Sequence, residues 1–231
     1  MKGILLGVGV GPGDPELMTI KAMRCIKAAD IICLPKASKE SCRAYLIAEQ
    51  AVPEITGKEC ICLDFKMIRE EEELKKLHQR AYQMIQSELS GGKTVAFLTV
   101  GDPTIYSTFS YMLEKARSDG FDAEIVSGIS SYHAAAARLG IALCEGEEEL
   151  HIGTGHSNIE ELLELPGTKI IMKAGHNIGK VKNILEKAER EKGIRITAIS
   201  DCGMPGEKRF ECASEIPMHE YMTTIIVNNR E

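Results

Sequence analysis

The chain of 231 residues contains no tryptophan, and its aromatic residues together make up only 5% of it. It also lacks any apolar run of the roughly 20 residues that a helix needs to cross a bilayer. The amino-terminal residues enter a strand-like run at once and then meet glycines, which is unlike a cleaved signal peptide. These absences predict a cytoplasmic protein that does not span or coat a membrane.

An excess of positive charge is also absent, because the net charge is -6. This argues against broad nucleic-acid binding, although an acidic protein can still have a cleft that is locally basic. The eight cysteines include no Cys-x-x-Cys pair. Cys60 and Cys62 form a Cys-x-Cys on one face of a strand-like run, and no second ligand pair follows at the spacing of a zinc site. We expect reduced thiols that pack as small apolar groups, and no protein-bound metal.

Two glycine-centred loops are the most informative features that are present. The glycine-rich loop, residues 7–15, follows the apolar run 4–6, and the Gly-Asp-Pro loop, residues 101–103, follows the apolar run 94–98. Each is typical of a loop at the carboxyl end of a buried strand, where open α/β sheets bind ligands. Glycine lets a backbone approach a ligand closely, and a following proline suits the first turn of a helix. Both loops are therefore predicted to border a binding site.

Strand-like and helix-like segments alternate along the first half of the chain, which favours a mainly parallel sheet. The longest helix is expected over residues 70–90, where apolar residues recur at helical spacing. The expected strands are 3–6, 30–34, 59–63, 94–99 and 122–126, and the expected helices are 15–27, 42–50, 70–90, 106–118 and 132–139.

Beyond residue 140 the pattern changes. A polar connection at residues 145–149 leads to a half in which the last strands follow one another without room for a helix, which favours a mixed sheet. The elements expected here are strands 150–152, 168–174, 194–199, 209–213 and 221–227, and a helix at 178–192. We predict two α/β domains, residues 1–127 with a parallel sheet and residues 128–231 with a mixed sheet, and a cleft between them.

A dinucleotide-binding interpretation fits the glycine-rich loop poorly. Counted from Gly7, the third glycine of the fingerprint is replaced by Pro12; counted from Gly9, it is replaced by Asp14. The second expected strand ends in Leu-Pro-Lys at 34–36 rather than in an acidic residue for a ribose. A phosphate-binding P-loop fails because no Gly-Lys-Ser/Thr follows. The alternative that the loop is only a tight turn and binds no ligand is not excluded. The presence of two such loops in one half of the chain argues against it.

Four segments together resemble the tetrapyrrole methyltransferases of the cobalamin (vitamin B12) pathway, which use S-adenosylmethionine (SAM). They are residues 8–19, 28–32, 101–103 and 126–131, and their order and spacing match over nearly the whole chain. Residues 101–111 and 130–140 look most like the subgroup that methylates C20 of precorrin-2 or cobalt-factor II. Uroporphyrinogen methyltransferases place an aspartate and an arginine where this chain has Leu-Pro-Lys-Ala at 34–37, which counts against that substrate.

The resemblance implies two α/β domains around an active-site trough, often in a homodimer, with SAM held largely by backbone groups. Carried over by position, the SAM-binding residues are Pro12, Val100, Gly101, Asp102, Ile105, Ser130, Ser131, Met172, Cys202, Thr223 and Thr224. The resemblance identifies no catalytic base. The implied activity is transfer of the SAM methyl group to C20 of precorrin-2 or cobalt-factor II. Methylation at another ring position, methylation of RNA or a protein side chain, and a non-catalytic SAM-binding relative are the alternatives.

Several of these residues also have simpler explanations. Asp102 could cap a helix, Met172 could belong to the core, and the two serines at 130–131 could form only a helix cap. The substrate carries eight carboxylates, so basic side chains are expected near it; the candidates are Lys36, Lys39, Arg43, Lys66, Arg69 and Arg138. The histidines that attract notice for cobalt or proton contacts are His133, His156 and His176, each of which could equally be a surface residue.

Overall fold

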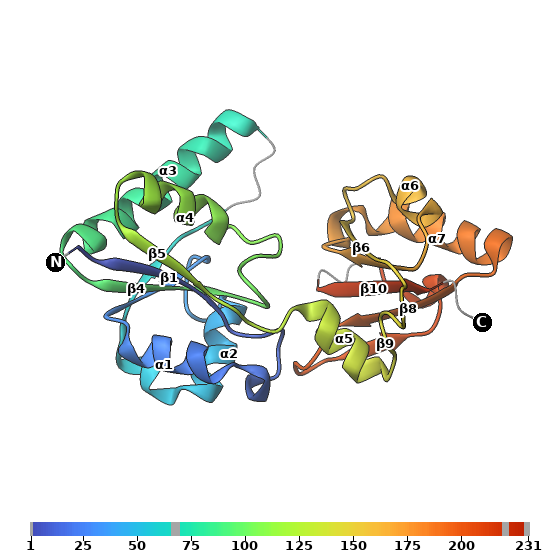
Figure 1. Ribbon diagram of the computed structural model, residues 1–231, viewed down its shortest axis with the longest axis horizontal. Coiled ribbons are helices and arrows are strands. Elements are labelled where there is room, and N and C mark those ends of the chain that lie inside the picture. Colours follow the sequence, from blue (N-terminus) through green and yellow to red (C-terminus); the bar gives the residue numbers. More distant parts are fainter. Residues whose placement is uncertain (1, 66–69, 219–221, 229–231) are drawn as a thin grey trace. The chain divides into compact units, whose positions relative to one another are not determined.

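The computed structural model describes residues 2–65, 70–218 and 222–228. The chain divides into two compact units, Met1–Ser130 and Ser131–Glu231. Each unit is an α/β structure around a five-stranded sheet, parallel in the first unit and mixed in the second (Figure 1). The predicted fold class is therefore confirmed. Among the described residues, no helix combines the length and the apolar character needed to cross a membrane.

The first sheet has the strand order β3-β2-β4-β1-β5 with every neighbouring pair parallel. Its strands are β1 (Ile4–Gly9), β2 (Ile31–Leu34), β3 (Glu59–Cys62), β4 (Thr94–Thr99) and β5 (Asp122–Val126). Because all five run in one direction, their carboxyl ends meet at the same end of the sheet. The neighbours β1 and β4 lead in opposite directions, to β2 and to β5, so a topological switch point lies between them. Both glycine-centred loops leave the sheet at this point.

Helices cover both faces of the first sheet (Figure 1). They are α1 (Ile20–Ala28), α2 (Arg43–Ala51), α3 (Glu71–Ser90) and α4 (Phe109–Ser118), with short 3-10 turns η1 (Pro15–Leu17) and η2 (Pro53–Gly57). Leu6 points to the core beneath α1 and α2, whereas its neighbour Leu5 points to the core beneath α3 and α4. This alternation is the period of two of a strand, and it explains why β1 is apolar throughout.

Two helices begin later than the sequence predicted. The expected helix 15–27 is split, because Thr19 caps α1 by accepting a hydrogen bond from the Ala22 N–H at 3.1 Å. The expected helix 106–118 begins at Phe109 because Tyr106 has a left-handed backbone, with φ of 48°. The Ser107 hydroxyl then accepts the Phe109 N–H at 3.1 Å. Local hydrogen bonds from side chains determine where these helices begin, and the spacing of apolar residues in the sequence does not reveal them.

The second sheet has the order β6-β7-β10-β8-β9. Its strands are β6 (Leu150–Thr154), β7 (Thr168–Met172), β8 (Arg195–Ser200), β9 (Lys208–Phe210) and β10 (Thr223–Asn228). Strands β6 and β7 are parallel, β10 is antiparallel to both β7 and β8, and β9 is antiparallel to β8. The carboxyl ends of β6, β7 and β8 therefore lie at the end of the sheet where β9 and β10 begin.

The helices of the second unit are α5 (Ser131–Leu139), α6 (Ile159–Glu164) and α7 (Ile178–Lys192), with 3-10 turns η3 (Gly175–Asn177) and η4 (Ala213–Glu215). The sequence analysis did not predict α6, which is short and flanked by polar residues. Ile159 and Leu163 of α6 join Val181 and Leu185 of α7 in one buried cluster with the sheet. Helix α5 packs against β8 and β10.

His78 makes the stability of the first unit depend on pH. Its ring lies 4.2 Å from that of Tyr111 and 5.7 Å from that of Phe65, centroid to centroid. Burial lowers the pKa of His78, and the nearby Lys115 ammonium lowers it further. The folded protein thus binds this proton less tightly than the unfolded chain does. The stabilisation is complete above the ordinary histidine pKa of about 6.5 and is lost as the pH falls through the lower, folded value.

We therefore expect the melting temperature to fall more steeply between about pH 7 and about pH 5 in the wild type than in His78→Phe. Phenylalanine keeps an aromatic ring beside Tyr111 but cannot take up a proton. Exposed His133 serves as the control position, and His133→Gln is expected to keep the wild-type slope. Thermal melts at several pH values measure this, and equal slopes for wild type and His78→Phe would contradict the assignment.

Candidate functional site

Three glycines bring the strand-end loops of the first unit into backbone contact. A Cβ on Gly9 would lie 2.6 Å from the Gly101 carbonyl oxygen and 2.6 Å from the Gly128 nitrogen, and a Cβ on Gly128 would lie 2.2 Å from the same oxygen. The Gly101 N–H also donates to the Gly11 carbonyl at 2.8 Å. The loops after β1, β4 and β5 thus meet where only glycine fits.

The glycines of the glycine-rich loop have separate structural tasks. A Cβ on Gly7 would lie 2.2 Å from the ring of Phe109, so this glycine makes room for α4 to pack on β1. Gly9 permits the backbone contact just described. Gly11 has φ of 77°, a conformation that favours glycine, and it turns the chain toward buried Pro12. None of the three needs a dinucleotide to explain it.

Asp102 joins two of these loops through its carboxylate. Its Oδ2 accepts a hydrogen bond from the Gly128 N–H at 2.9 Å, and its Oδ1 accepts one from the Thr104 N–H at 2.8 Å and another from the Thr104 hydroxyl. The residue is only 9% exposed. The carboxylate therefore holds the Gly-Asp-Pro loop and the loop after β5 together, and it does more than cap a local turn.

The other predicted site residues of the first unit lie in the same group of loops. Val100 and Ile105 are half-buried on either side of the Gly-Asp-Pro loop. Ser130 is buried after the loop that follows β5. The Thr19 hydroxyl donates to the Ser127 carbonyl at 3.3 Å, which ties the start of α1 to that loop. The predicted site residues up to Ser130 thus lie in the strand-end loops of the first unit, although the sequence analysis placed Ser130 in the second domain.

In the second unit, strand register brings the predicted residues to one end of the sheet. Thr223 pairs with Ser200, the last residue of β8, while Ile225 pairs with Ile171 of β7. The start of β10, which carries Thr223 and Thr224, therefore lies beside Met172 at the end of β7 and beside the loop with Cys202 after β8. Both threonines and Cys202 are buried, and Met172 is half-buried.

The same end of the second sheet carries Lys173, which the sequence analysis did not single out. It follows Met172 with φ of 52°, an uncommon conformation for a side chain of its size. Partial desolvation of the ammonium lowers the pKa of Lys173, although the residue as a whole is exposed. Strained backbone positions of this kind gather at functional sites, so Lys173 adds a basic group of perturbed pKa to the candidate site.

His156 has a defined hydrogen-bonding state at this end of the sheet. The Asn177 Nδ2 lies 2.9 Å from the Gly155 carbonyl oxygen and 2.9 Å from His156 Nδ1. A carbonyl only accepts, so the first contact fixes the orientation of the amide, and its second N–H points to Nδ1. The neutral His156 ring must then carry its proton on Nε2. The side chain of His176 lies outside the described residues.

We expect nitrogen-15 spectra of the imidazole groups to show His156 as the Nε2–H tautomer at neutral pH. The variant His156→Gln assigns the signals by their loss. Asn177→Leu removes the amide that fixes the tautomer, so a mixture of both tautomers is expected there. An Nδ1–H tautomer in the wild type would show that the Asn177 contact is oriented differently.

The described basic candidates for substrate carboxylates differ in their surroundings. Lys36 is exposed after β2, and the Lys39 ammonium lies 5.3 Å from the ring of Tyr45. The Arg138 Nε lies 3.7 Å from Oε2 of Glu207, so this arginine belongs to an ion pair. Lys66 and Arg69 lie outside the described residues.

The cysteines are free thiols, and several of them gather around β2 and β3. Burial raises the pKa of the Cys33 thiol well above its ordinary value, and Cys62, Cys42 and Cys60 nearby raise it further. Neutral thiols are poor nucleophiles and poor metal ligands. Within residues 2–65, 70–218 and 222–228, no group of three or more histidine, cysteine and acidic side chains is arranged to hold a metal ion.

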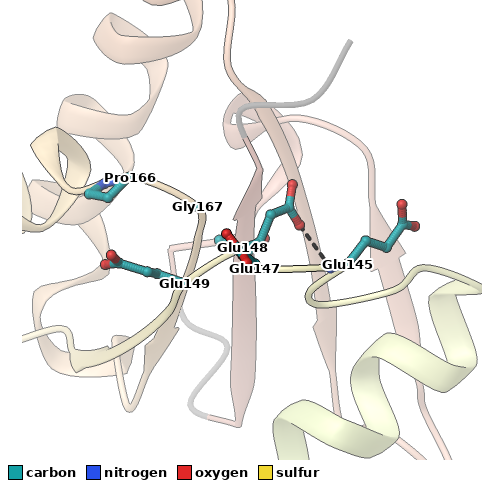
Figure 2. Close-up of a pocket in the computed structure, with 7 residues that line it drawn as sticks. Glu145, Glu147, Glu148, Glu149, Pro166 and Gly167 are labelled. Carbon is teal, nitrogen blue, oxygen red and sulfur yellow. Dashed lines mark hydrogen bonds between the residues drawn. The ribbon is translucent and has the colours of Figure 1, made fainter.

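A pocket of about 400 Å³ in the second unit has the wrong charge for the implied substrate. Its lining includes Glu145, Glu147, Glu148 and Glu149, next to the turn at Gly167 (Figure 2). The Glu145 N–H donates to the Glu148 carboxylate at 3.0 Å. A molecule with eight carboxylates would be repelled by four glutamates, so we do not assign this pocket to the site.

Known proteins agree with the arrangement of loops and strands. The family model for Tetrapyrrole (Corrin/Porphyrin) Methylases matches residues 5–216. The probable cobalt-precorrin-2 C(20)-methyltransferase of Methanocaldococcus jannaschii is 41% identical over 182 residues, 78% of this chain and 74% of the relative. The cobalt-precorrin-2 C(20)-methyltransferase of Salmonella typhimurium is 28% identical over 240 residues, 100% and 98% of the two chains.

A solved structure shows the same fold. The uroporphyrin-III C-methyltransferase of Thermus thermophilus complexed with S-adenosylhomocysteine superposes with a TM-score of 0.70 and 18% identity, covering 99% of this chain and 97% of that one. Two α/β units with glycine-built loops at a switch point, matched by the family over most of the length, define the class of protein. The chain belongs to the tetrapyrrole (corrin/porphyrin) methylases.

Proposed function

We propose that the protein transfers a methyl group from SAM to C20 of precorrin-2 or of cobalt-factor II in cobalamin biosynthesis. The observation that carries this proposal is the relative named as a probable cobalt-precorrin-2 C(20)-methyltransferase, 41% identical over 78% of the chain. A second relative with a C(20)-methyltransferase name matches along the whole chain. The proposed substrate is thus a reduced tetrapyrrole, and SAM is the cosubstrate.

We propose that SAM contacts residues in the strand-end loops of the first sheet and residues near the end of the second sheet where β7 and β8 finish and β10 begins. In the first unit these are Pro12, Val100, Gly101, Asp102, Ile105 and Ser130. In the second unit they are Ser131, Met172, Cys202, Thr223 and Thr224. Glycine-permitted backbone contacts and small hydroxyl side chains suit a ligand that offers an adenosine and an amino-acid group for hydrogen bonding. The structure of the relative with bound S-adenosylhomocysteine supports this choice of ligand.

For this reaction the protein mainly has to align the methyl group with the sulfur of SAM and with C20. The SAM sulfonium supplies the methyl group and its own leaving group, and C20 of a reduced tetrapyrrole is an electron-rich bridge carbon. Holding the methyl group in line between sulfur and carbon converts an encounter of two molecules into a step within one complex, which is worth several kcal/mol. Asp102 serves this purpose indirectly by fixing the loops on which SAM would rest. Lys173 and His156 are the basic and hydrogen-bonding groups at the C-terminal end of the second sheet.

Mass spectrometry after incubation with SAM and each substrate tests the proposal. We expect one methyl group to be added to precorrin-2, to cobalt-factor II or to both, and the comparison between them shows whether the enzyme requires cobalt. No addition to either would contradict the proposed reaction. Addition at another carbon would favour a methyltransferase acting elsewhere on the ring, and SAM binding without any transfer would favour a non-catalytic relative.

We also propose a homodimer, as the family resemblance implies, and, from the sequence pattern, a cytoplasmic location and domains at residues 1–127 and 128–231. Light scattering at several protein concentrations measures the assembly. A mass of twice that of the chain is expected, and a monomer at all concentrations would contradict the proposal.

A further inference from the structure

The connection from β8 to β9, residues 201–207, is a tightly folded loop. Asp201 has φ of 47° and Gly203 has φ of 74°, so the chain turns twice through left-handed conformations. The Met204 N–H donates to the Asp201 carbonyl at 2.9 Å, and the Glu207 N–H donates to the Met204 carbonyl at 3.1 Å. This loop carries Cys202 between its first two turn residues. Its conformation therefore decides where the backbone around Cys202 lies.

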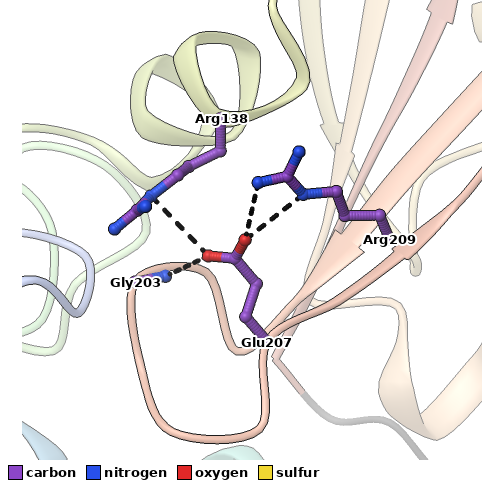
Figure 3. A network of polar contacts seen from close by, with 4 residues as sticks. All are labelled: Arg138, Gly203, Glu207 and Arg209. Carbon is purple, nitrogen blue, oxygen red and sulfur yellow. Dashed lines mark hydrogen bonds and ion pairs between the residues drawn. The ribbon is translucent and has the colours of Figure 1, made fainter.

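The carboxylate of Glu207 closes this loop (Figure 3). Its Oε2 accepts a hydrogen bond from the Gly203 N–H at 2.9 Å, and its Oε1 accepts from the Arg209 guanidinium at 3.1 Å and 3.3 Å. The Glu207 side chain is 20% exposed, less than the arginines around it. The Gly203 N–H, Arg209 and Arg138 together lower the pKa of Glu207, so the carboxylate stays ionised at neutral pH.

The same carboxylate connects the loop to α5. Arg138, in the last turn of α5, places its Nε 3.7 Å from Oε2 of Glu207. At the other end of α5, the Thr224 hydroxyl donates to the Ser131 hydroxyl at 3.4 Å. Helix α5 is thus attached to β10 at its first turn and to the 201–207 loop at its last. Helix α5 thus connects the segments that carry the proposed SAM-binding residues Cys202, Ser131 and Thr224, and Glu207 provides its contact with the 201–207 loop.

We infer that Glu207 is a positioning residue for SAM binding, which acts by fixing the 201–207 loop and the end of α5. This inference rests on the proposed function. Glu207 touches neither the methyl group nor C20 in this account. Its effect reaches the ligand through the backbone of Cys202 and Gly203, and both the length and the acceptor atoms of its side chain matter.

Calorimetry with S-adenosylhomocysteine tests this with variants that separate length from charge. Losing a charge-assisted bond at a partly buried amide costs about 1.5 kcal/mol or more, so Glu207→Ala is expected to bind about tenfold more weakly. Glu207→Asp keeps the charge but is too short to reach the Gly203 N–H, and the same loss is expected. Glu207→Gln keeps an acceptor at the original length for the Gly203 N–H. Its NH₂ group then faces Arg209, which is exposed and can be solvated by water, so the affinity is expected to stay within about threefold of wild type. Arg138→Met removes only the contact with α5 and leaves the Gly203 bond in place, so it is expected to change the affinity less than Glu207→Asp does.

Two further measurements separate positioning from general stability. Amide hydrogen exchange at Gly203 is expected to accelerate in Glu207→Asp and to stay near wild type in Glu207→Gln. The KM for SAM is expected to rise in Glu207→Asp while the KM for the tetrapyrrole is unchanged.

Wild-type affinity in Glu207→Asp, with faster exchange at Gly203, would overturn the inference. If Glu207→Ala does not fold, the affinities of Glu207→Asp and Glu207→Gln for S-adenosylhomocysteine are enough to test the inference. A wild-type protein without affinity for S-adenosylhomocysteine would contradict the proposed function and this inference together, whereas a loss restricted to the variants concerns Glu207 alone.

Discussion

Gly128→Ala is expected to weaken S-adenosylhomocysteine binding by about thirtyfold or more. The added Cβ would lie 2.2 Å from the Gly101 carbonyl oxygen and 2.9 Å from the Gly9 backbone, and no backbone atom can yield as the end of a flexible side chain does. Forcing an extra methyl group into a packed site costs about 1–3 kcal/mol, and about 2 kcal/mol at the binding loops corresponds to about thirtyfold in Kd. Calorimetry measures the affinity, and a thermal melt shows whether the first unit remains folded.

Gly57→Ala is the matched control for this prediction. Gly57 ends η2 in the same unit, and nothing lies within 4 Å of the position that its Cβ would occupy. The affinity and the melting temperature of this variant are expected to match the wild type. If Gly128→Ala bound S-adenosylhomocysteine as tightly as Gly57→Ala does, the meeting of the three loops would not form the SAM site.

Asp102→Ala is expected to weaken S-adenosylhomocysteine binding by about tenfold or more while the protein still folds. The change leaves the Gly128 and Thr104 N–H groups without the carboxylate that holds them, and each charge-assisted bond is worth about 1.5–3 kcal/mol. Asp102→Asn should not rescue binding. An amide has one acceptor atom, so its NH₂ group would face one of the two N–H donors.

Asp122→Asn supplies the control for Asp102. Asp122 is exposed at the start of β5, and its amide variant is expected to behave as wild type. Calorimetry on the four proteins measures the effect. Full affinity in Asp102→Asn would mean that one accepted bond suffices and that the carboxylate does not join the two loops.

The order of strand-like and helix-like segments was enough to predict the fold of the first unit. Apolar strands alternate with helices up to residue 140, which requires a parallel sheet with helices on both faces, and the observed sheet agrees. The family was predicted from the four segments 8–19, 28–32, 101–103 and 126–131, and it is confirmed by the family match. The assignment of individual residues to SAM stays a prediction.

The remaining features depend on contacts between residues far apart in the chain. The approach of Gly128 to Gly9 and Gly101 could not be predicted, because it follows from strand order and not from spacing. The acceptor role of Asp102 toward Gly128 has the same origin. Glu207 gave no sequence signal, since an acidic residue followed by two basic ones, Lys208 and Arg209, is ordinary on a surface. Short helices such as α6 were missed because one turn and a half shows little periodicity.

The position of the transferred methyl group tests the central claim most directly. The protein is incubated with precorrin-2 or cobalt-factor II and SAM labelled with carbon-13 in its methyl group, and the product is examined by NMR. The account predicts a single labelled methyl group, attached to C20. A label on any other ring carbon, or no label in the tetrapyrrole with either substrate, would contradict it.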